Sequence, residues 1–232
     1  MMPDSRRAIV VLALLALTPA ASTGQTRQPQ PARPATNAPL TFRGFGDAGA
    51  TVFTATQSFT TILGRPSGAV FGGGVELVLP PHLFLSVAAS RFSRGGHRVF
   101  VFEGQVFDLN VPTTITVTPL EVTIGYRFTR PPPRAGTRRR VVPYAGGGVG
   151  WHKYHETSGH STDTDDVSRT FTGYHVLGGA DVPMTKWIAA AAEAQWASVP
   201  NALGNDPHAV SSLYNEHNLG GFTFRMKVIV GR

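Results

Sequence analysis

The segment from His152 to Asp166 holds the densest group of side chains that could bind a metal or activate a nucleophile. Its histidines and aspartates are His152, His155, His160, Asp163, Asp165 and Asp166. Imidazole and carboxylate groups bind zinc and calcium, but this spacing matches no established ligand pattern. We therefore predict a polar surface loop that holds no metal and needs no cofactor, with metal binding as the alternative.

The same segment offers the parts of a hydrolase, with His152 as a base and Glu156 as the acid that orients it. Ser158 or Ser161 would be the nucleophile, because a serine needs an adjacent base to become reactive. All these residues lie in one loop rather than on rigid strand ends, and no recognisable motif supports them. The sequence therefore predicts no catalytic residues and no enzymatic activity, with a lipid A-modifying hydrolase at the rim as an alternative function.

Seven charged residues occur in segments where polar and apolar positions alternate. They are Glu76, Glu121, Arg127, Asp181, Glu193, Arg225 and Lys227, and Asp47 is a further candidate. Glycines share their face, as Gly72 and Gly74 do with Glu76. Small residues let opposite walls approach, and paired charges avoid isolated buried ions, so the combination indicates a narrow lumen. We predict an ion-pair network that plugs this lumen, with a narrow channel as the alternative.

A further candidate site is an apolar ribbon within the segment 94–112, with a turn predicted at Glu103-Gly104. Its leading residues are Val99, Phe100, Phe102 and Phe107. Each arm is too short to cross a membrane, so we predict a hairpin above it rather than two more barrel strands. An exposed strand edge is a template for pairing, which makes an extracellular protein a candidate partner. A ribbon that folds over the barrel mouth is the alternative.

Eight segments with a period of two residues must position these side chains. In the clearest of them, from Phe222 to Val230, every second residue is large and apolar, and Arg225 and Lys227 lie between. Each segment has at least ten residues, which suits a tilted strand that crosses the hydrocarbon in about 9–11 residues. The segments are 42–54, 68–79, 83–93, 113–128, 141–154, 169–182, 186–198 and 218–230.

One of these strands has an irregular pattern, because its apolar positions change parity at Pro119. Ile115 and Val117 precede the proline, whereas Leu120 and Ile124 follow it on the other parity. Proline cannot donate to a strand ladder, so we predict a β-bulge at Pro119 that returns all four side chains to one face.

The connections alternate in length, and aromatic residues gather near the strand ends. Short turns at 80–82 and 183–185 contrast with longer polar loops, which are 55–67, 94–112, 155–168 and 199–217. Short turns on one rim and long loops on the other are typical of outer-membrane barrels. We expect aromatic girdles from Tyr144, Trp151, Tyr154, Tyr174, Trp187 and Trp196.

Composition and the N-terminus agree with export. Residues 1–24 read as a signal peptide, with Arg6 and Arg7 before a short apolar stretch, and the proline-rich residues 25–40 as a periplasmic tether. Charged residues are 15% of the chain, against about 25% in soluble domains, as expected where the surface faces lipid. Cysteine is absent, which excludes disulfides and thiol chemistry. The net charge of +7 suits anionic lipid and lipopolysaccharide, and no pattern of stacking aromatics indicates nucleic acid.

Several motifs carry a resemblance to a known group. They are Pro143-Tyr144-Ala145-Gly146-Gly147-Gly148-Val149-Gly150, Gly178-Gly179-Ala180-Asp181, Gly125-Tyr126-Arg127-Phe128 and the amphipathic last strand. Residues 41–232 resemble the small eight-stranded outer-membrane β-barrels of the OmpA-like and OmpX-like kind. The resemblance implies an all-β, antiparallel up-and-down transmembrane barrel in the cell outer membrane.

The resemblance also implies a monomer with a plugged polar interior, inserted by the outer-membrane assembly machinery. Its expected role is structural in the envelope, or adhesion at the surface. One departure is the end of the chain, because members often end on an aromatic residue and this chain ends Val230-Gly231-Arg232. An insertion signal would then rest on Phe222, Phe224 and the apolar positions that follow.

Overall fold

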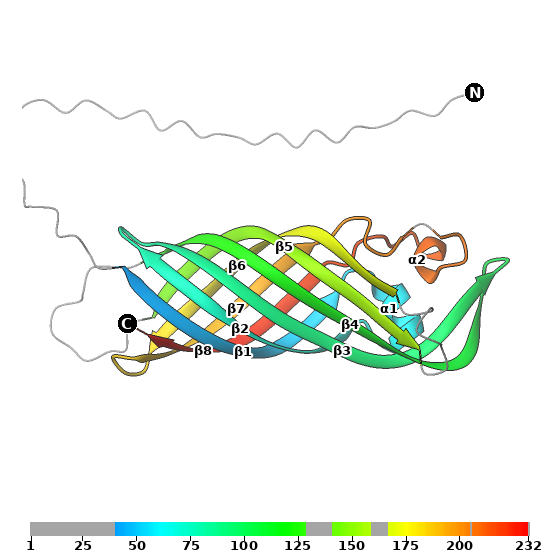
Figure 1. The fold of residues 1–232 in the computed structure, drawn as a ribbon, viewed down its shortest axis with the longest axis horizontal. Helices are drawn as coiled ribbons and strands as arrows, with labels where there is room; N and C mark the ends of the chain where they lie inside the picture. Colours follow the sequence, from blue (N-terminus) through cyan, green and yellow to red (C-terminus); the bar gives the residue numbers. More distant parts are fainter. Residues whose placement is uncertain (1–39, 129–140, 159–166, 205, 232) are drawn as a thin grey trace, which may run out of the picture. The chain divides into compact units, whose positions relative to one another are not determined.

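The computed structural model describes residues 40–128, 141–158, 167–204 and 206–231. Eight antiparallel strands close into a barrel in chain order, with β1 paired to both β2 and β8 (Figure 1). The strands are β1 (Thr41–Phe53), β2 (Ser67–Leu79), β3 (Leu83–Phe102), β4 (Gln105–Arg127), β5 (Val142–Ser158), β6 (Val167–Pro183), β7 (Ile188–Ser198) and β8 (Gly221–Gly231). The predicted fold class is confirmed. The predicted export signal and nearly all of the predicted tether lie outside the described residues.

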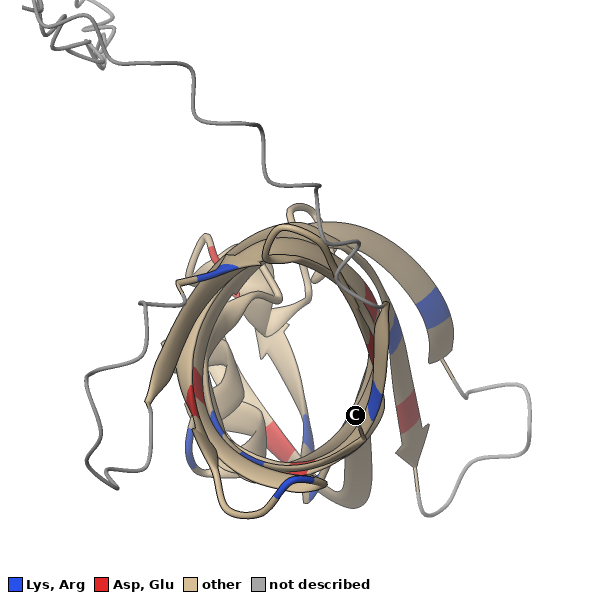
Figure 2. Ribbon diagram, turned by 90° about the vertical axis from the view of Figure 1, so that its left-hand side faces the viewer, with Lys and Arg blue, Asp and Glu red and all other residues tan. Residues whose placement is uncertain are grey.

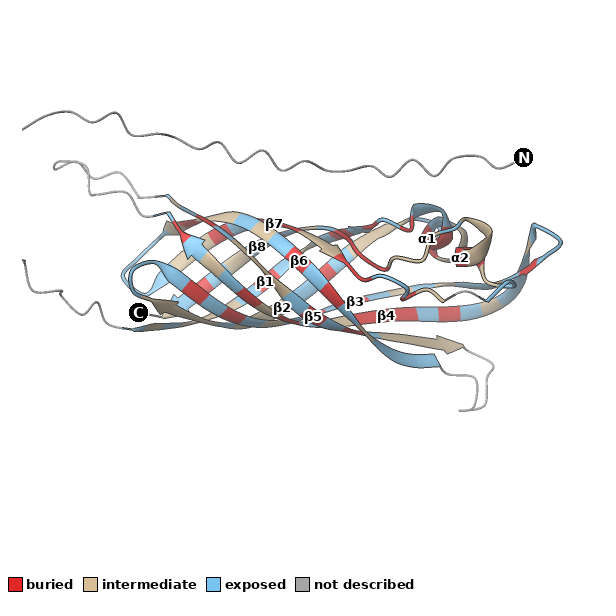
Figure 3. Ribbon diagram, turned by 90° about the horizontal axis from the view of Figure 1, so that it is seen from above, coloured by how far each residue is buried: buried red, intermediate tan, exposed pale blue. Residues whose placement is uncertain are grey.

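Buried and exposed positions alternate along much of the barrel wall (Figure 3), most regularly on β8. The large exposed side chains are apolar. On β8 the side chains of Phe224 and Met226 are 58% and 63% exposed, whereas Arg225 between them is 6% exposed. Large exposed apolar residues also cover the other strands, as the outer face of a transmembrane barrel requires. Neither of the two helices in the described residues is long and apolar enough to cross a membrane.

The expected aromatic girdles are only partly correct. Trp151 and Tyr174 are exposed on the outer face, Trp187 is exposed in the β6–β7 turn, and Trp196 is half-buried against Tyr174. Tyr144 is instead buried in the lumen, and Tyr154 packs against apolar residues at one end of it. Both tyrosines lie on the inward parity of β5, which proximity to a strand end does not reveal.

Inward glycines let the wall close around a narrow lumen. At Gly148 a Cβ atom would lie 1.9 Å from the carbonyl oxygen of Val122 on the neighbouring strand, and at Gly49 it would lie 2.0 Å from that of Phe224. No side chain fits so close to a neighbouring backbone, so these positions require glycine.

The predicted bulge at Pro119 is wrong. The β4 register continues through this residue, since Val117 pairs with Phe92 and Leu120 with Ala89. Ile115 and Val117 therefore point into the barrel, where both are buried. The parity of the apolar positions changes because the inward side chains of β4 change from polar to apolar at this point of the strand.

The β3–β4 pairing becomes irregular further along, where the register shifts between Arg98 and Val99. Asn110 on the opposite strand has φ of +53°, a backbone conformation common at bulges. Beyond this point the hairpin continues β3 and β4 as one ribbon to the turn at Glu103-Gly104, where both residues have positive φ. The turn and the eight-strand count are thus confirmed, while the hairpin belongs to the barrel strands.

Two loops expected to be polar instead bring short helices to the same end of the barrel as the hairpin, here called the loop end (Figure 1). The helices are α1 (Thr56–Leu63), between β1 and β2, and α2 (Val210–Leu213), between β7 and β8. Phe59 and Leu63 of α1 are buried in an apolar cluster that we call the mouth cluster. It contains Phe53, Ala55, Phe59, Leu63, Phe92, Ile115, Val117, Val199, Ala202 and Leu219.

The ends of α1 explain why it is fixed in place. The backbone N–H groups of Gln57 and Ser58 donate to the carboxylate of Glu216, at 3.1 and 2.8 Å. A carboxylate is favoured there because the N-terminal N–H groups lack helical partners and carry partial positive charge. Gly64 ends the helix in the left-handed conformation, with φ of +75°. The β7–β8 connection therefore holds the β1–β2 loop in position.

Candidate functional site

The lumen holds its charges in two groups, and Figure 2 shows acidic and basic positions around the barrel wall. The first group lies toward the short turns, at what we call the turn end. Arg127 donates to Asp181 and, at 3.2 Å, to Glu76. Arg43 donates to the same two carboxylates, with 3.2 Å to Asp181. Two cations and two anions from β1, β2, β4 and β6 thus bridge the lumen.

Glu193 organises the second group. Lys227 Nζ lies 2.6 Å from its Oε2 atom, and the hydroxyl of Tyr144 donates to the same oxygen at 3.0 Å. Arg225 Nε is 3.6 Å from Oε1. Glu193 is 5% exposed, so the two donors to Oε2 and the nearby Arg225 cation replace the water that its charge would otherwise require.

Glu121 is the second acceptor in this group. Gln195 Nε2 donates to Glu121 at 2.6 Å, and Gln195 in turn accepts a hydrogen bond from Arg225. The Nδ1 atom of His175 lies 3.8 Å from Glu121, and its Nε2 atom is 2.8 Å from the hydroxyl of Thr123. Gln195 therefore connects Glu121 to Arg225, and through Arg225 to Glu193, within this second group.

The structure brings together all seven charged residues that the sequence pattern assigns to the lumen. Sequence reasoning missed Arg43 and Tyr144, which donate hydrogen bonds to the lumen carboxylates. The β1–β2 register is the information that would have identified Arg43, because this residue lies directly opposite Glu76. Register cannot be read from one strand's alternation alone.

Asp47 also points into the lumen, but its carboxylate differs from the other four in its hydrogen bonding. It is 8% exposed, and neither carboxylate oxygen has a hydrogen-bond partner. Lys227 lies opposite Asp47 on β8. Its ammonium nitrogen lies over the Phe45 ring, 4.5 Å from the ring centre. Four lumen cations thus face five carboxylates, of which Asp47 alone accepts no hydrogen bond within the described part of the chain.

Two small cavities lie in the lumen. One of about 50 Å³ separates the charged network from the mouth cluster, with Glu121 and His152 on one side and Phe53 and Phe92 on the other. A second of about 10 Å³ lies within the network near Glu193. A water needs a cavity of about 10–15 Å³ by this measure, so the first space suits a few waters and the second one at most.

The histidine-rich segment does not assemble as a site in the described residues. His152 is buried in the lumen with its Nε2 atom unpaired, while Ser158 ends β5 six residues further along the strand. At about 3.3 Å per residue the two are roughly 20 Å apart, too far for a base and its nucleophile. His160, Ser161 and the three aspartates lie outside the described residues. Elsewhere in the described chain no three His, Asp or Glu side chains are grouped as metal ligands.

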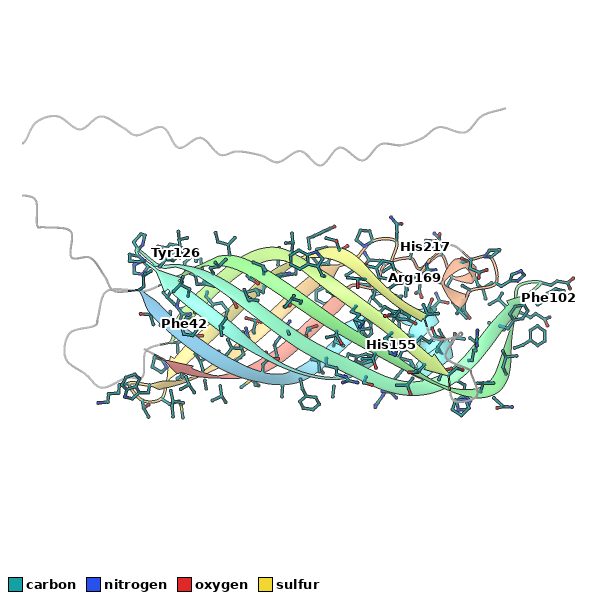
Figure 4. All side chains as sticks on the ribbon, in the orientation of Figure 1. Phe42, Phe102, Tyr126, His155, Arg169 and His217 are labelled. Atoms are coloured by element: carbon teal, nitrogen blue, oxygen red, sulfur yellow. The ribbon has the colours of Figure 1, made fainter. Side chains whose placement is uncertain are left out.

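The hairpin of β3 and β4 presents an apolar face beyond the rim. Phe100, Phe102, Phe107 and Leu109 are 39–51% exposed, and Figure 4 shows Phe102 at the far tip, pointing outward. We call these four side chains the ribbon face. Leu109 was not among the predicted residues, and Val99 is half-buried on the other side of the ribbon.

The opposite side of the ribbon contacts the β7–β8 connection. Val101 is 4% exposed, and its backbone N–H donates to the carbonyl of His208 at 3.3 Å. The His208 ring stacks on Phe100 with ring centres 5.2 Å apart, and its Nδ1 atom lies 3.2 Å from the Val101 carbonyl. The β7–β8 connection therefore holds the ribbon in position: it covers Val101 on one side and also contacts Phe100 of the ribbon face.

Comparisons with known proteins agree with this architecture. No family model matches the chain, and no curated protein matches its sequence. Among solved structures, Neisserial surface protein A is 14% identical, with a TM-score of 0.50 over 83% of this chain and 99% of its own. A major outer membrane protein from Thermus thermophilus is 10% identical, with a TM-score of 0.51 over 83% and 99%. This chain has the fold of the small eight-stranded outer-membrane β-barrels. At these identities the likeness concerns the fold alone.

Proposed function

We propose that this outer-membrane-type barrel has a closed lumen, supports the envelope structurally and acts through its loop end. The loop end would face the cell exterior, because the short connections of such barrels are periplasmic. The apolar belt would contact outer-membrane lipid and lipopolysaccharide, and insertion would use the outer-membrane assembly machinery. The closed ladder leaves the wall no unpaired strand, which supports a monomer.

The observation that carries the surface role is the ribbon face. Four large apolar side chains stand exposed on a rigid ribbon past the rim, where they would meet water rather than lipid. Contiguous exposed apolar groups on a folded protein mark an interaction surface. The ribbon would therefore bind an extracellular protein.

The ribbon's edges suit the same partner. β3 pairs with β2 only as far as Phe92, and β4 pairs with β5 only from Thr113 onward. Within the described residues, the segment 105–109 consequently has no third strand beside it. A partner could add a strand to this edge and place its apolar side chains on the ribbon face.

The test of the surface role is binding by the barrel in lipid nanodiscs to a panel of immobilised extracellular matrix and serum proteins, measured by surface plasmon resonance. We expect saturable binding to at least one protein, and a loss of at least tenfold in the variant F100S/F102S/F107S. The matched control is E103N/Q105S, which changes polar residues of the same ribbon and should bind within about twofold of wild type. Equal binding by the triple variant would contradict a role for the ribbon face.

Closure of the lumen is tested by conductance in planar bilayers. The charged network and the mouth cluster lie in series along the lumen, so the wild-type barrel should show no stable openings. Phe59→Ala loosens the mouth only, and it should remain silent because the ion pairs persist below it. Stable, ion-selective openings in the wild type would instead support the narrow channel.

A further inference from the structure

A separate cavity of about 140 Å³ lies at the loop end, and its lining includes neither the lumen ion pairs nor the ribbon face. Ile115 of β4 and Phe59 and Ile62 of α1 form apolar walls, and Leu203 and Val210 of the β7–β8 connection complete them. Hydrocarbon-lined cavities of about 150 Å³ are known to hold a benzene molecule. The volume and lining therefore suit a hydrocarbon group of that size.

The polar atoms of this cavity are few. Ser58 is 3% exposed, and its hydroxyl has no hydrogen-bond partner although the residue lines the cavity. The hydroxyl of Ser211 is by contrast satisfied by the Leu203 carbonyl at 2.9 Å. A buried hydroxyl without a partner costs free energy, and a bound ligand could supply the missing hydrogen bond.

The strongest polar group in the cavity is the carboxylate of Glu156. It accepts a hydrogen bond from the hydroxyl of Tyr154 at 3.0 Å and forms no ion pair in the described part of the chain. The residue lines the cavity and is only partly buried. A carboxylate in the lining favours a cation over an anion as the charged group of a ligand.

We propose that this cavity binds a small amphipathic amine. Its hydrocarbon body, about the size of a benzene ring, occupies the apolar chamber, and its protonated nitrogen pairs with Glu156. The Ser58 hydroxyl offers a second hydrogen bond in the wall. Apolar enclosure with one or two placed polar groups is the usual construction of a small-molecule site. The site does not depend on the ribbon face or on the proposed binding of a protein.

The test uses the whole barrel in nanodiscs with isotope-labelled isoleucine methyl groups, observed by NMR. Benzylamine is the probe, and benzyl alcohol is its uncharged match. Ile62 and Ile115 line the cavity, whereas Ile124 and Ile188 are exposed on the lipid-facing wall. We expect saturable shifts of the first pair only. Equal shifts of all four methyl groups would show partitioning into lipid, and no shift at millimolar benzylamine would show an unoccupied cavity; either result overturns the proposal.

Two kinds of variant distinguish the contribution of the charge from that of the apolar enclosure. Glu156→Gln should weaken the binding of benzylamine at least tenfold and leave the binding of benzyl alcohol unchanged. Glu103→Gln, on the exposed hairpin turn, should change the binding of neither probe. Leu203→Trp should weaken the binding of both probes by filling the chamber. Ala209 also lines the cavity, so Ala209→Leu makes the same test with a smaller change if the first variant folds poorly. Benzylamine bound equally by wild type and Glu156→Gln would remove the carboxylate from the site.

Discussion

Toward the turn end of the lumen, β4 contributes Glu121 and Arg127 to ion pairs, whereas toward the loop end the same face contributes Ile115 and Val117 to the mouth cluster. Both regions fill the interior of one narrow barrel, which leaves little room that side chains do not occupy. They do so with different interactions. The charged half depends on the pairing of specific atoms, and the apolar half depends on packed volume.

The difference predicts how each half responds to change. A buried ion whose partner is removed keeps its desolvation cost and loses its attraction, so the charged half should be sensitive to single substitutions. An apolar cluster loses contacts roughly in proportion to the atoms removed, and a surface helix such as α1 can partly relax into the space. The charged half should therefore show the larger losses.

The largest effect is expected for Glu193→Leu. This change leaves Lys227 and the Tyr144 hydroxyl without their carboxylate. Arg225 loses the same carboxylate and keeps Gln195 and Glu121 as partners. We expect the free energy of unfolding to fall by about 3–5 kcal/mol, the range for breaking a buried ion pair from one side. Urea titration of the barrel in lipid vesicles, followed by tryptophan fluorescence, measures this quantity. A loss below about 1 kcal/mol would mean that water reaches this part of the lumen.

A smaller loss is expected for Phe59→Ala in the mouth cluster. Phe59 stacks on Phe53 with ring centres 4.2 Å apart, so truncation removes one aromatic contact and leaves a cavity under α1. Truncating a phenylalanine to alanine in a rigid core lowers the free energy of unfolding by about 3–5 kcal/mol. Here we expect a loss of about 2–3 kcal/mol, because α1 can move to fill part of the cavity. The same urea titration applies, with Thr60→Ala on the exposed side of α1 as the control. A loss larger than that of Glu193→Leu would reverse the proposed order of the two halves.

The two halves also differ in what the sequence reveals. Alternation identified the strands and the charged residues because both follow a period of two. The same rule failed at Pro119, where Ile115 and Val117 were assigned to the lipid-facing side although they line the mouth. A pattern of polarity cannot tell lipid from an apolar interior, so a lumen that changes from polar to apolar imitates a bulge.

The sequence also does not reveal which charged residues pair with one another across the lumen. Arg127 and Asp181 interact from β4 and β6, 54 residues apart, and strand patterns contain no register that would join them. Arg43 and Tyr144 were missed as network members for the same reason. α1 did leave a signal, because Phe59 and Leu63 are separated by four residues and thus share one face of a helix. The β-strand context concealed it.

The smallest effect is expected for Asp47→Asn, which tests whether every lumen charge must be paired. Asp47 accepts no hydrogen bond, so neutralising it removes a desolvation cost as well as the attraction of Lys227 and Arg225. These contributions oppose each other, and we expect the free energy of unfolding to change by less than about 1 kcal/mol. Glu193→Gln is the matched acid-to-amide control and should lose more, because its carboxylate has direct donors. Equal losses of unfolding free energy in the two variants would show that Asp47 stabilises the barrel as much as a hydrogen-bonded carboxylate does. Long-range charge balance, rather than direct hydrogen bonding, would then govern the stability of the charged half.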